Sequence, residues 1–184
     1  MSKIQPTDVK DLSANLLRPE YYRLHMRKTL ILSLLLCLAL PQNSYAASKS
    51  ITGEFGQTLT ASSTSIANNS LITVTGKRFD ESVGIYLAIC VIPKKAMMPT
   101  PCGGGVNKAG VGEGSFWISS NPPPYGVDLA DPFKPGGRFS YQIRVSQKIG
   151  KFDCKKVKCA VTVRADHLRS EDRSYDLYLP IKFK

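Results

Sequence analysis

Residues 150–183 read GKFDCKKVKCAVTVRADHLRSEDRSYDLYLPIKF, and two cysteines, Cys154 and Cys159, stand near the start of this stretch with four residues between them. A β-prone run follows over 160–163, then a polar, charged turn, then an alternating run over 176–183. Two such runs joined by a polar turn predict a β-hairpin. A close cysteine pair at the start of one strand is typical of small exported β-domains, which have little room for a large core.

Outside this hairpin, the sequence predicts five further strands. The run 138–145, RFSYQIRV, alternates strictly and predicts an antiparallel strand with one face in solvent. The run 84–92, GIYLAICVI, is almost wholly apolar and predicts a central strand with both faces covered. The other three runs are less regular: 51–61, 71–76 and 115–119. Because no helical periodicity of useful length accompanies them, these strands predict an all-β, antiparallel, immunoglobulin-like sandwich of about seven strands.

The amino-terminal part of the chain has the order of a secretory signal. Arg27 and Lys28 precede an apolar run of eleven residues, 30–40. That run is shorter than the roughly 18 residues that a membrane-spanning helix needs. Small residues at the positions that a signal peptidase inspects follow it, Ser44 and Ala46. This order predicts an N-terminal signal helix that is removed on export.

The signal divides the chain into a leader and a domain. Residues 1–46 are expected to be leader and signal peptide, and residues 47–184 the β-sandwich domain. Met26 directly precedes the charged segment, so residues 1–25 are either an extended leader or an upstream-start extension. We expect a secreted or cell-surface protein, and a signal retained as an anchor is the alternative.

Four of the five cysteines belong to the domain, because Cys37 lies in the apolar run of the leader. An even number of cysteines in an exported domain indicates disulfides, and four cysteines allow three pairings. The local pairing, Cys90 with Cys102 and Cys154 with Cys159, is favoured because each pair lies at a strand end followed by a short loop. A zinc site is the rival interpretation, but neither pair has the usual ligand spacing, so no metal is expected.

The domain is basic. Six of the 25 basic and three of the 14 acidic residues lie in residues 1–46, which leaves the domain a net charge of +8. The densest basic cluster brackets the second cysteine pair: Lys148, Lys151, Lys155, Lys156 and Lys158. It is either an anion patch for wall polymer or lipid, with salt-sensitive binding, or a solvated strand edge that discourages aggregation. Nucleic acid is not an expected partner, since an exported protein rarely meets it.

Short runs along the domain resemble known families. Four features resemble the neocarzinostatin family of secreted actinobacterial proteins: ITVTG at 72–76, GIYLAIC at 84–90, Cys154-x4-Cys159, and IKF at 181–183. The run WISSNPPPYG at 117–126 is similar to uncharacterised domains of actinobacterial envelope proteins, some attached to haem-uptake modules. The first resemblance implies an immunoglobulin-like sandwich with two local disulfides. It also implies a cleft beside the first disulfide, in which the best-known members hold an enediyne chromophore.

The predicted binding site lies on a connection that is rich in glycine and proline. This connection, residues 94–137, contains Phe116, Trp117 and Tyr125. Aromatic side chains on a loop held by a rigid scaffold can anchor a partner or an apolar ligand. Alternatively, Trp117 fills the sandwich core, as a lone tryptophan in a small domain often does.

His167 is the only histidine of the domain, and it follows Asp166 and precedes serines such as Ser170. No GxSxG elbow or comparable signal accompanies them, so the sequence predicts no catalytic triad and no enzyme. Haem ligation by His167 with Tyr125 or Tyr86 is a further interpretation, although no cofactor is expected.

The sequence thus predicts a non-catalytic, exported domain that binds a protein partner or a small apolar ligand through residues 94–125. A carrier of an enediyne-type chromophore is one alternative. The other is a structural, wall-associated domain.

Overall fold

The computed structural model describes residues 48–104, 111–112 and 114–184. The predicted leader, its signal helix and Cys37 lie outside this part of the chain. Within it, the only helices are two 3-10 turns, η1 (Pro124–Gly126) and η2 (His167–Arg169). Neither turn is long and apolar enough to cross a membrane.

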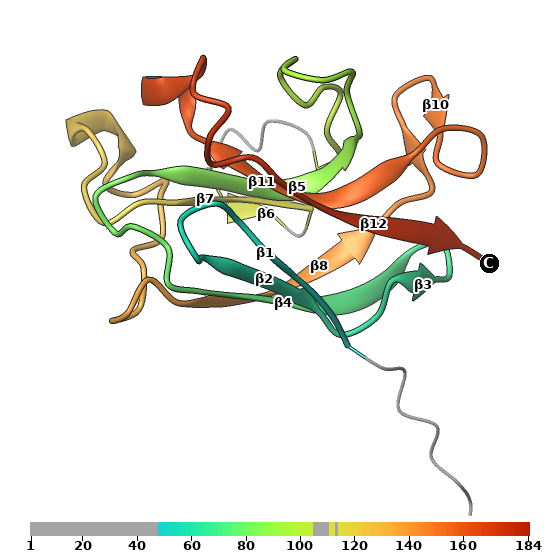
Figure 1. Cartoon of the computed structure of the whole chain (residues 1–184), viewed down its shortest axis with the longest axis horizontal. Helices are drawn as coiled ribbons and strands as arrows, with labels where there is room; N and C mark the ends of the chain where they lie inside the picture. The colour runs from blue at the N-terminus through green and yellow to red at the C-terminus, as the bar shows by residue number, and fades with distance from the viewer. Residues whose placement is uncertain (1–47, 105–110, 113) are drawn as a thin grey trace, which may run out of the picture. The chain divides into compact units, whose positions relative to one another are not determined.

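Two sheets hold most of the described strands (Figure 1). The first has the order β1-β2-β4-β8 and consists of β1 (Lys49–Thr52), β2 (Thr58–Ala61), β4 (Ser70–Lys77) and β8 (Phe139–Val145). The second has the order β3-β12-β11-β5-β7-β6 and consists of β3 (Ser65–Ile66), β12 (Leu177–Phe183), β11 (Cys159–Ala165), β5 (Ile85–Val91), β7 (Ser115–Ile118) and β6 (Val111–Gly112). A separate hairpin is formed by β9 (Lys148–Ile149) and β10 (Phe152–Asp153).

The predicted all-β fold is confirmed, and each predicted strand has a counterpart. The prediction of one strand over 51–61 is wrong, because β1 and β2 are separate strands joined by a turn in which Gly56 has a φ of 79°. The two-residue strands were not predicted, because so short a pairing leaves no periodic pattern. Among the strands of four or more residues, β1-β2-β4-β8 lies against β12-β11-β5-β7, so the two sheets form a sandwich.

The core lies between the two sheets. In the first sheet the side chains of Val74 and Ile143 are fully buried, and in the second those of Leu87, Val161 and Val163 are fully buried. Burial of each such side chain contributes roughly 1.5–3 kcal/mol. Burial along β8 alternates, as its sequence predicts.

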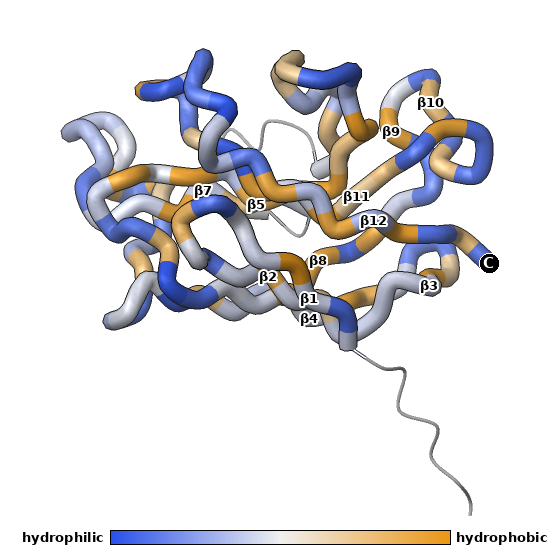
Figure 2. The backbone as a smooth tube through the Cα atoms, viewed as in Figure 1, coloured by the Kyte–Doolittle hydropathy of each residue, from blue (hydrophilic) through white to orange (hydrophobic). Residues whose placement is uncertain are grey.

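The central strands β5 and β11 are buried on their outer faces too, as the apolar run at 84–92 predicts. Figure 2 shows both strands as largely hydrophobic. Ala88 is 6% exposed and Thr162 is 1% exposed, although both belong to the outer face. Beyond the two large sheets the described residues form only the small β9–β10 hairpin, and loop residues such as Cys102, Gly103 and Leu129 lie over this outer face.

Both predicted disulfides are present. Cys90 of β5 is joined to Cys102 in the following loop, and Cys154 is joined to Cys159 at the start of β11. Disulfides form and persist in oxidising compartments, so the two bonds are those of an extracellular protein.

We expect the first disulfide to stabilise the domain more than the second, because it closes the longer loop. The separations are 12 and 5 residues, which correspond to about 3 and about 2 kcal/mol in the chain-entropy description. Urea unfolding of the Cys90→Ser/Cys102→Ser and Cys154→Ser/Cys159→Ser double variants checks this order. An equal or reversed loss would show that native packing, not loop closure, dominates.

Candidate ligand-binding site

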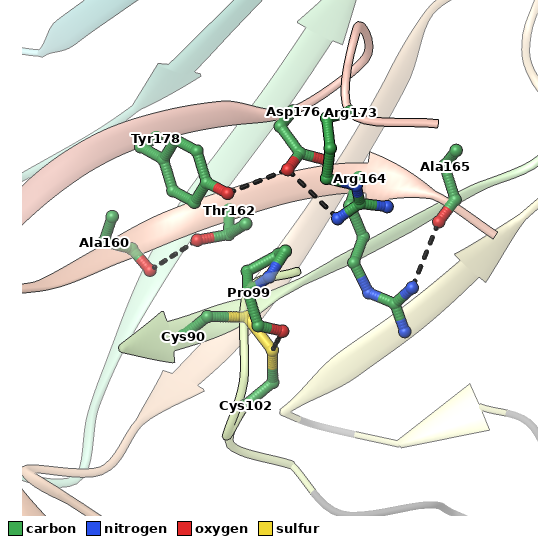
Figure 3. The surroundings of a disulfide bond; sticks show 10 residues. All are labelled: Cys90, Pro99, Cys102, Ala160, Thr162, Arg164, Ala165, Arg173, Asp176 and Tyr178. Atoms are coloured by element: carbon green, nitrogen blue, oxygen red, sulfur yellow. Dashed lines mark hydrogen bonds and ion pairs between the residues drawn. A yellow bond between two sulfur atoms is a disulfide. The ribbon is translucent and has the colours of Figure 1, made fainter. Parts of the chain in front are cut away.

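A cavity of about 440 Å³ lies on the outer face of the second sheet. Strands β5, β7 and β11 form its floor, and three loops form its walls. It is lined by Tyr86, Ala88, Cys90, Cys102, Gly103, Ser115, Phe116, Trp117, Tyr125, Leu129, Thr162, Arg164 and His167. Figure 3 shows the Cys90–Cys102 disulfide with Thr162 and Arg164 of β11 beside it.

The hollow arises from small side chains at neighbouring positions of the sheet. Ala88 pairs with Thr162 and Cys90 pairs with Ala160, so four small residues lie together on the outer face. Larger side chains border them, because Tyr86 on the same face of β5 pairs with Trp117 of β7. Small residues at the centre and aromatic residues at the edge leave a space that is apolar in its lining.

Trp117 is held in place by a buried carboxylate. Its indole Nε1–H donates to Asp166 Oδ2 over 3.0 Å, and the backbone N–H of Leu168 donates to Asp166 Oδ1 over 3.0 Å. Asp166 is only 1% exposed and begins the turn η2. A Cβ atom on Gly84 would stand 1.9 Å from Asp166 Oδ2, so only glycine fits there. Asp166 therefore fixes the tryptophan and the turn that carries His167.

His167 joins two tyrosines at the rim of the cavity. Its Nδ1 is 2.5 Å from the Tyr86 hydroxyl and its Nε2 is 2.7 Å from the Tyr125 hydroxyl. The imidazole also lies edge-on to Trp117, with ring centroids 4.9 Å apart. Burial, with a smaller contribution from Asp166, raises the pKa of Tyr86, which keeps its hydroxyl protonated at neutral pH. A neutral imidazole satisfies both bonds, since one ring nitrogen donates and the other accepts.

Arg164 supplies positive charge to the cavity. Its guanidinium lies over the Tyr86 ring, 5.0 Å from the centroid, and donates to the carbonyl of Ala165 over 3.3 Å. Arg164 forms no salt bridge with any residue that the structure describes; the nearby ion pair joins Arg173 to Asp176. The guanidinium therefore retains donors for an incoming group.

The three aromatic residues that the sequence singles out do not all have the same place in the structure. Trp117 and Tyr125 border the cavity, and Tyr125 is 62% exposed. Phe116 also touches the cavity, but it belongs to the buried cluster between the sheets and stacks on Tyr141 with centroids 4.2 Å apart. Trp117 is buried, with 6% of its surface exposed, but it lies on the outer face of the second sheet and not in the core between the sheets.

Sequence reasoning missed the part that Tyr86, Arg164 and His167 play together at the cavity. A usable signal was the alternation in β5, which places Tyr86, Ala88 and Cys90 on one face of a strand otherwise filled by core residues. The sequence grouped His167 with Tyr125 or Tyr86 only as possible haem ligands; in the structure the imidazole is hydrogen-bonded to both tyrosines.

The arrangement around His167 is not that of a catalytic triad. Asp166 accepts its hydrogen bonds from Trp117 and Leu168, while both imidazole nitrogens bond to tyrosines. In the described part of the chain, no three His, Cys, Asp or Glu side chains gather in a way that could hold a metal ion.

The predicted anion patch lies away from the cavity lining. All five of its lysines are exposed and lie around the second disulfide: Lys148, Lys151, Lys155, Lys156 and Lys158.

Comparisons with known proteins give one similar structure. No protein-family model matches the sequence, and no curated protein matches it. A solved structure of macromomycin matches 75% of this chain and 100% of its own chain, with 13% sequence identity and a TM-score of 0.40. This degree of similarity assigns no family, so the resemblances to the neocarzinostatin family and to actinobacterial envelope domains stay predictions.

Replacement of Asp166 by alanine is expected to lower the free energy of unfolding by about 1–3 kcal/mol, because the buried indole N–H and the partly buried N–H of Leu168 lose their acceptor. It should also move the fluorescence of Trp117, the only tryptophan of the chain, to longer wavelength. Urea unfolding and emission spectra measure the two effects. Asp128→Ala, at an exposed position of the neighbouring loop, is the matched control. An unchanged emission maximum would contradict the proposed anchoring of the indole.

Proposed function

We propose that this protein is a non-catalytic binding domain for a small apolar ligand that carries an acidic group. The observation that supports this most directly is the apolar cavity on the outer face of the β5–β7–β11 sheet. Its volume of about 440 Å³ lies within the roughly 300–1,000 Å³ of typical small-molecule sites. Such sites combine an apolar lining with a few polar groups that orient the ligand.

The preference for an acidic group follows from the charges at the cavity. Arg164 lines it, and no carboxylate side chain does. Two buried carboxylates near Arg164 are already engaged: Asp166 accepts from Trp117 and Leu168, and Asp176 is paired with Arg173 and accepts from Tyr178. A guanidinium bordered by apolar side chains forms charge-assisted hydrogen bonds that are stronger than those between neutral groups.

The remaining polar groups can position such a ligand. Tyr125 is exposed and is held by a single bond to His167, so it can move without disturbing the core. The Tyr86 hydroxyl, in contrast, is fixed by its bond to His167 Nδ1. We infer that Tyr86 and Arg164 form the permanent wall of the site and that Tyr125 adjusts to the ligand.

The alternative of a chromophore carrier uses the same cavity. It differs in one expectation, which is that the protein purified from its native secretion carries a bound species that absorbs light. The two functions can be tested separately. The preference for acidic ligands is measured with added ligands, and the carrier role is tested on the protein as isolated from its native secretion.

Two naphthylamine fluorophores test the proposal, because they share an aromatic body and differ in a sulfonate: 8-anilinonaphthalene-1-sulfonate and N-phenyl-1-naphthylamine. Both are expected to bind, and Arg164→Gln is expected to weaken only the sulfonate, by roughly ten- to a hundredfold, which corresponds to the roughly 1.5–3 kcal/mol of a hydrogen bond to a charged group. Ala88→Leu, which fills the floor, should weaken both. Fluorescence titration measures each dissociation constant.

The control is Leu71→Ser, which removes an exposed apolar side chain of the other sheet and should leave both titrations unchanged. Far-UV circular dichroism verifies that each variant is folded. Binding that survives Ala88→Leu would place the fluorophores elsewhere and reject the cavity. An equal loss for both fluorophores in Arg164→Gln would reject the preference for acidic ligands.

A further inference from the structure

One end of the sandwich gathers three lysine-bearing segments. The first follows β5 and contains Lys94 and Lys95. The second is the β9–β10 hairpin, with Lys148 and Lys151. The third leads into β11, with the exposed residues Lys155, Lys156 and Lys158.

Backbone contacts hold these segments together. The N–H of Ile92 donates to the carbonyl of Lys158 over 2.9 Å, directly beyond the pairing of Val91 with Cys159. The N–H of Cys154 donates to the carbonyl of Gln147 over 2.9 Å, which ties the third segment to the hairpin. In Figure 1 the loop after β5 and the segments around β10 rise from the same side of the molecule.

Few acidic residues neutralise the lysines at this end of the sandwich. The three segments, residues 93–98, 146–151 and 152–158, contain a single acidic residue, Asp153. Its carboxylate accepts hydrogen bonds from the backbone N–H of Lys155 over 2.9 Å and from the Gln147 side chain over 3.0 Å. These bonds lower the pKa of Asp153 below its usual value, but they do not pair it with a lysine ammonium group.

Two exposed methionines lie among the lysines. Met97 is 57% exposed and Met98 is 44% exposed, and they follow directly on Lys94, Lys95 and Ala96. Ala96 has a φ of 62°, so the chain turns sharply between the lysines and the methionines. Figure 2 shows hydrophilic and hydrophobic stretches side by side in this loop. Among the large hydrophobic side chains that are exposed in the described residues, these two are the only ones adjacent in the sequence.

We propose that this end of the sandwich docks on the surface of an anionic phospholipid bilayer. The lysines are attracted to acidic head groups, and Met97 and Met98 enter the boundary between head groups and acyl chains. A soluble or wall-bound polyanion would satisfy the lysines but would give the methionines no apolar surroundings. The exposed methionine pair therefore favours lipid over polymer. This docking surface is independent of the function proposed for the cavity.

Co-sedimentation of the full chain with vesicles tests the proposal. Binding to vesicles of equal parts phosphatidylglycerol and phosphatidylcholine should exceed binding to phosphatidylcholine alone by at least tenfold at 50 mM NaCl, and should fall steeply at 500 mM. Lys155→Glu/Lys156→Glu should lose at least tenfold in affinity. The control is Lys77→Glu/Lys134→Glu, which changes the charge equally at exposed positions outside the three segments and should bind like the parent chain.

The variant Met97→Ser/Met98→Ser distinguishes binding to lipid from binding to a soluble polyanion. It should weaken binding to the acidic vesicles severalfold while leaving binding to soluble inorganic polyphosphate unchanged. All variants share residues 1–47 with the parent, so differences between them report on the docking surface. The proposal is overturned if the methionine variant binds acidic vesicles as well as the parent does, or if both lysine double variants lose affinity equally. Circular dichroism shows whether each variant is folded.

Discussion

The ladder between β5 and β11 determines the core and the cavity together. It runs from the pairing of Ile85 with Ala165 to that of Val91 with Cys159. Because side chains alternate across a strand, this register turns Leu87 inward and its neighbour Ala88 outward. A slip of one residue would exchange the two sets, so that small side chains would enter the core and large ones would fill the hollow. The register that builds the core therefore also leaves the floor of the cavity, which loop residues then enclose.

The elements that the sequence predicted well are those whose burial follows a simple period. Strand β8 alternates because one face is wet, and β5 is continuously apolar because both faces are covered. The disulfides were predictable because each closes a short loop at a strand end. The turn that divides β1 from β2 was not predictable from periodicity, because Gly56 changes the chain direction through its backbone conformation and not through a side chain.

The binding site was predicted only in part, because neighbours in a strand face opposite sides. Phe116 and Trp117 are adjacent in the sequence, yet the first enters the core and the second borders the cavity. Unless the strand register is known, the sequence alone cannot tell which of two adjacent aromatic residues faces the core. The role of His167 depends on contacts across 81 and 42 residues of sequence, with Tyr86 and Tyr125. The sequence named these three residues together only as possible haem ligands, and the hydrogen bonds among them follow from the fold.

The first disulfide lies at one end of a loop that borders the cavity and carries Met97 and Met98 at its tip. Its far end is fixed, because Cys102 is bonded to Cys90 and the N–H of Gly103 donates to the carbonyl of Ile89 over 2.6 Å. That end forms a wall of the cavity. Between these anchors and β5, the tip with Met97 and Met98 extends into solvent. The N–H of Val91 also donates to the carbonyl of Pro101 over 3.0 Å, so backbone bonds and the disulfide together tie this end of the loop to β5. The cavity wall is therefore fixed to the sheet, while the exposed tip is accessible to another surface.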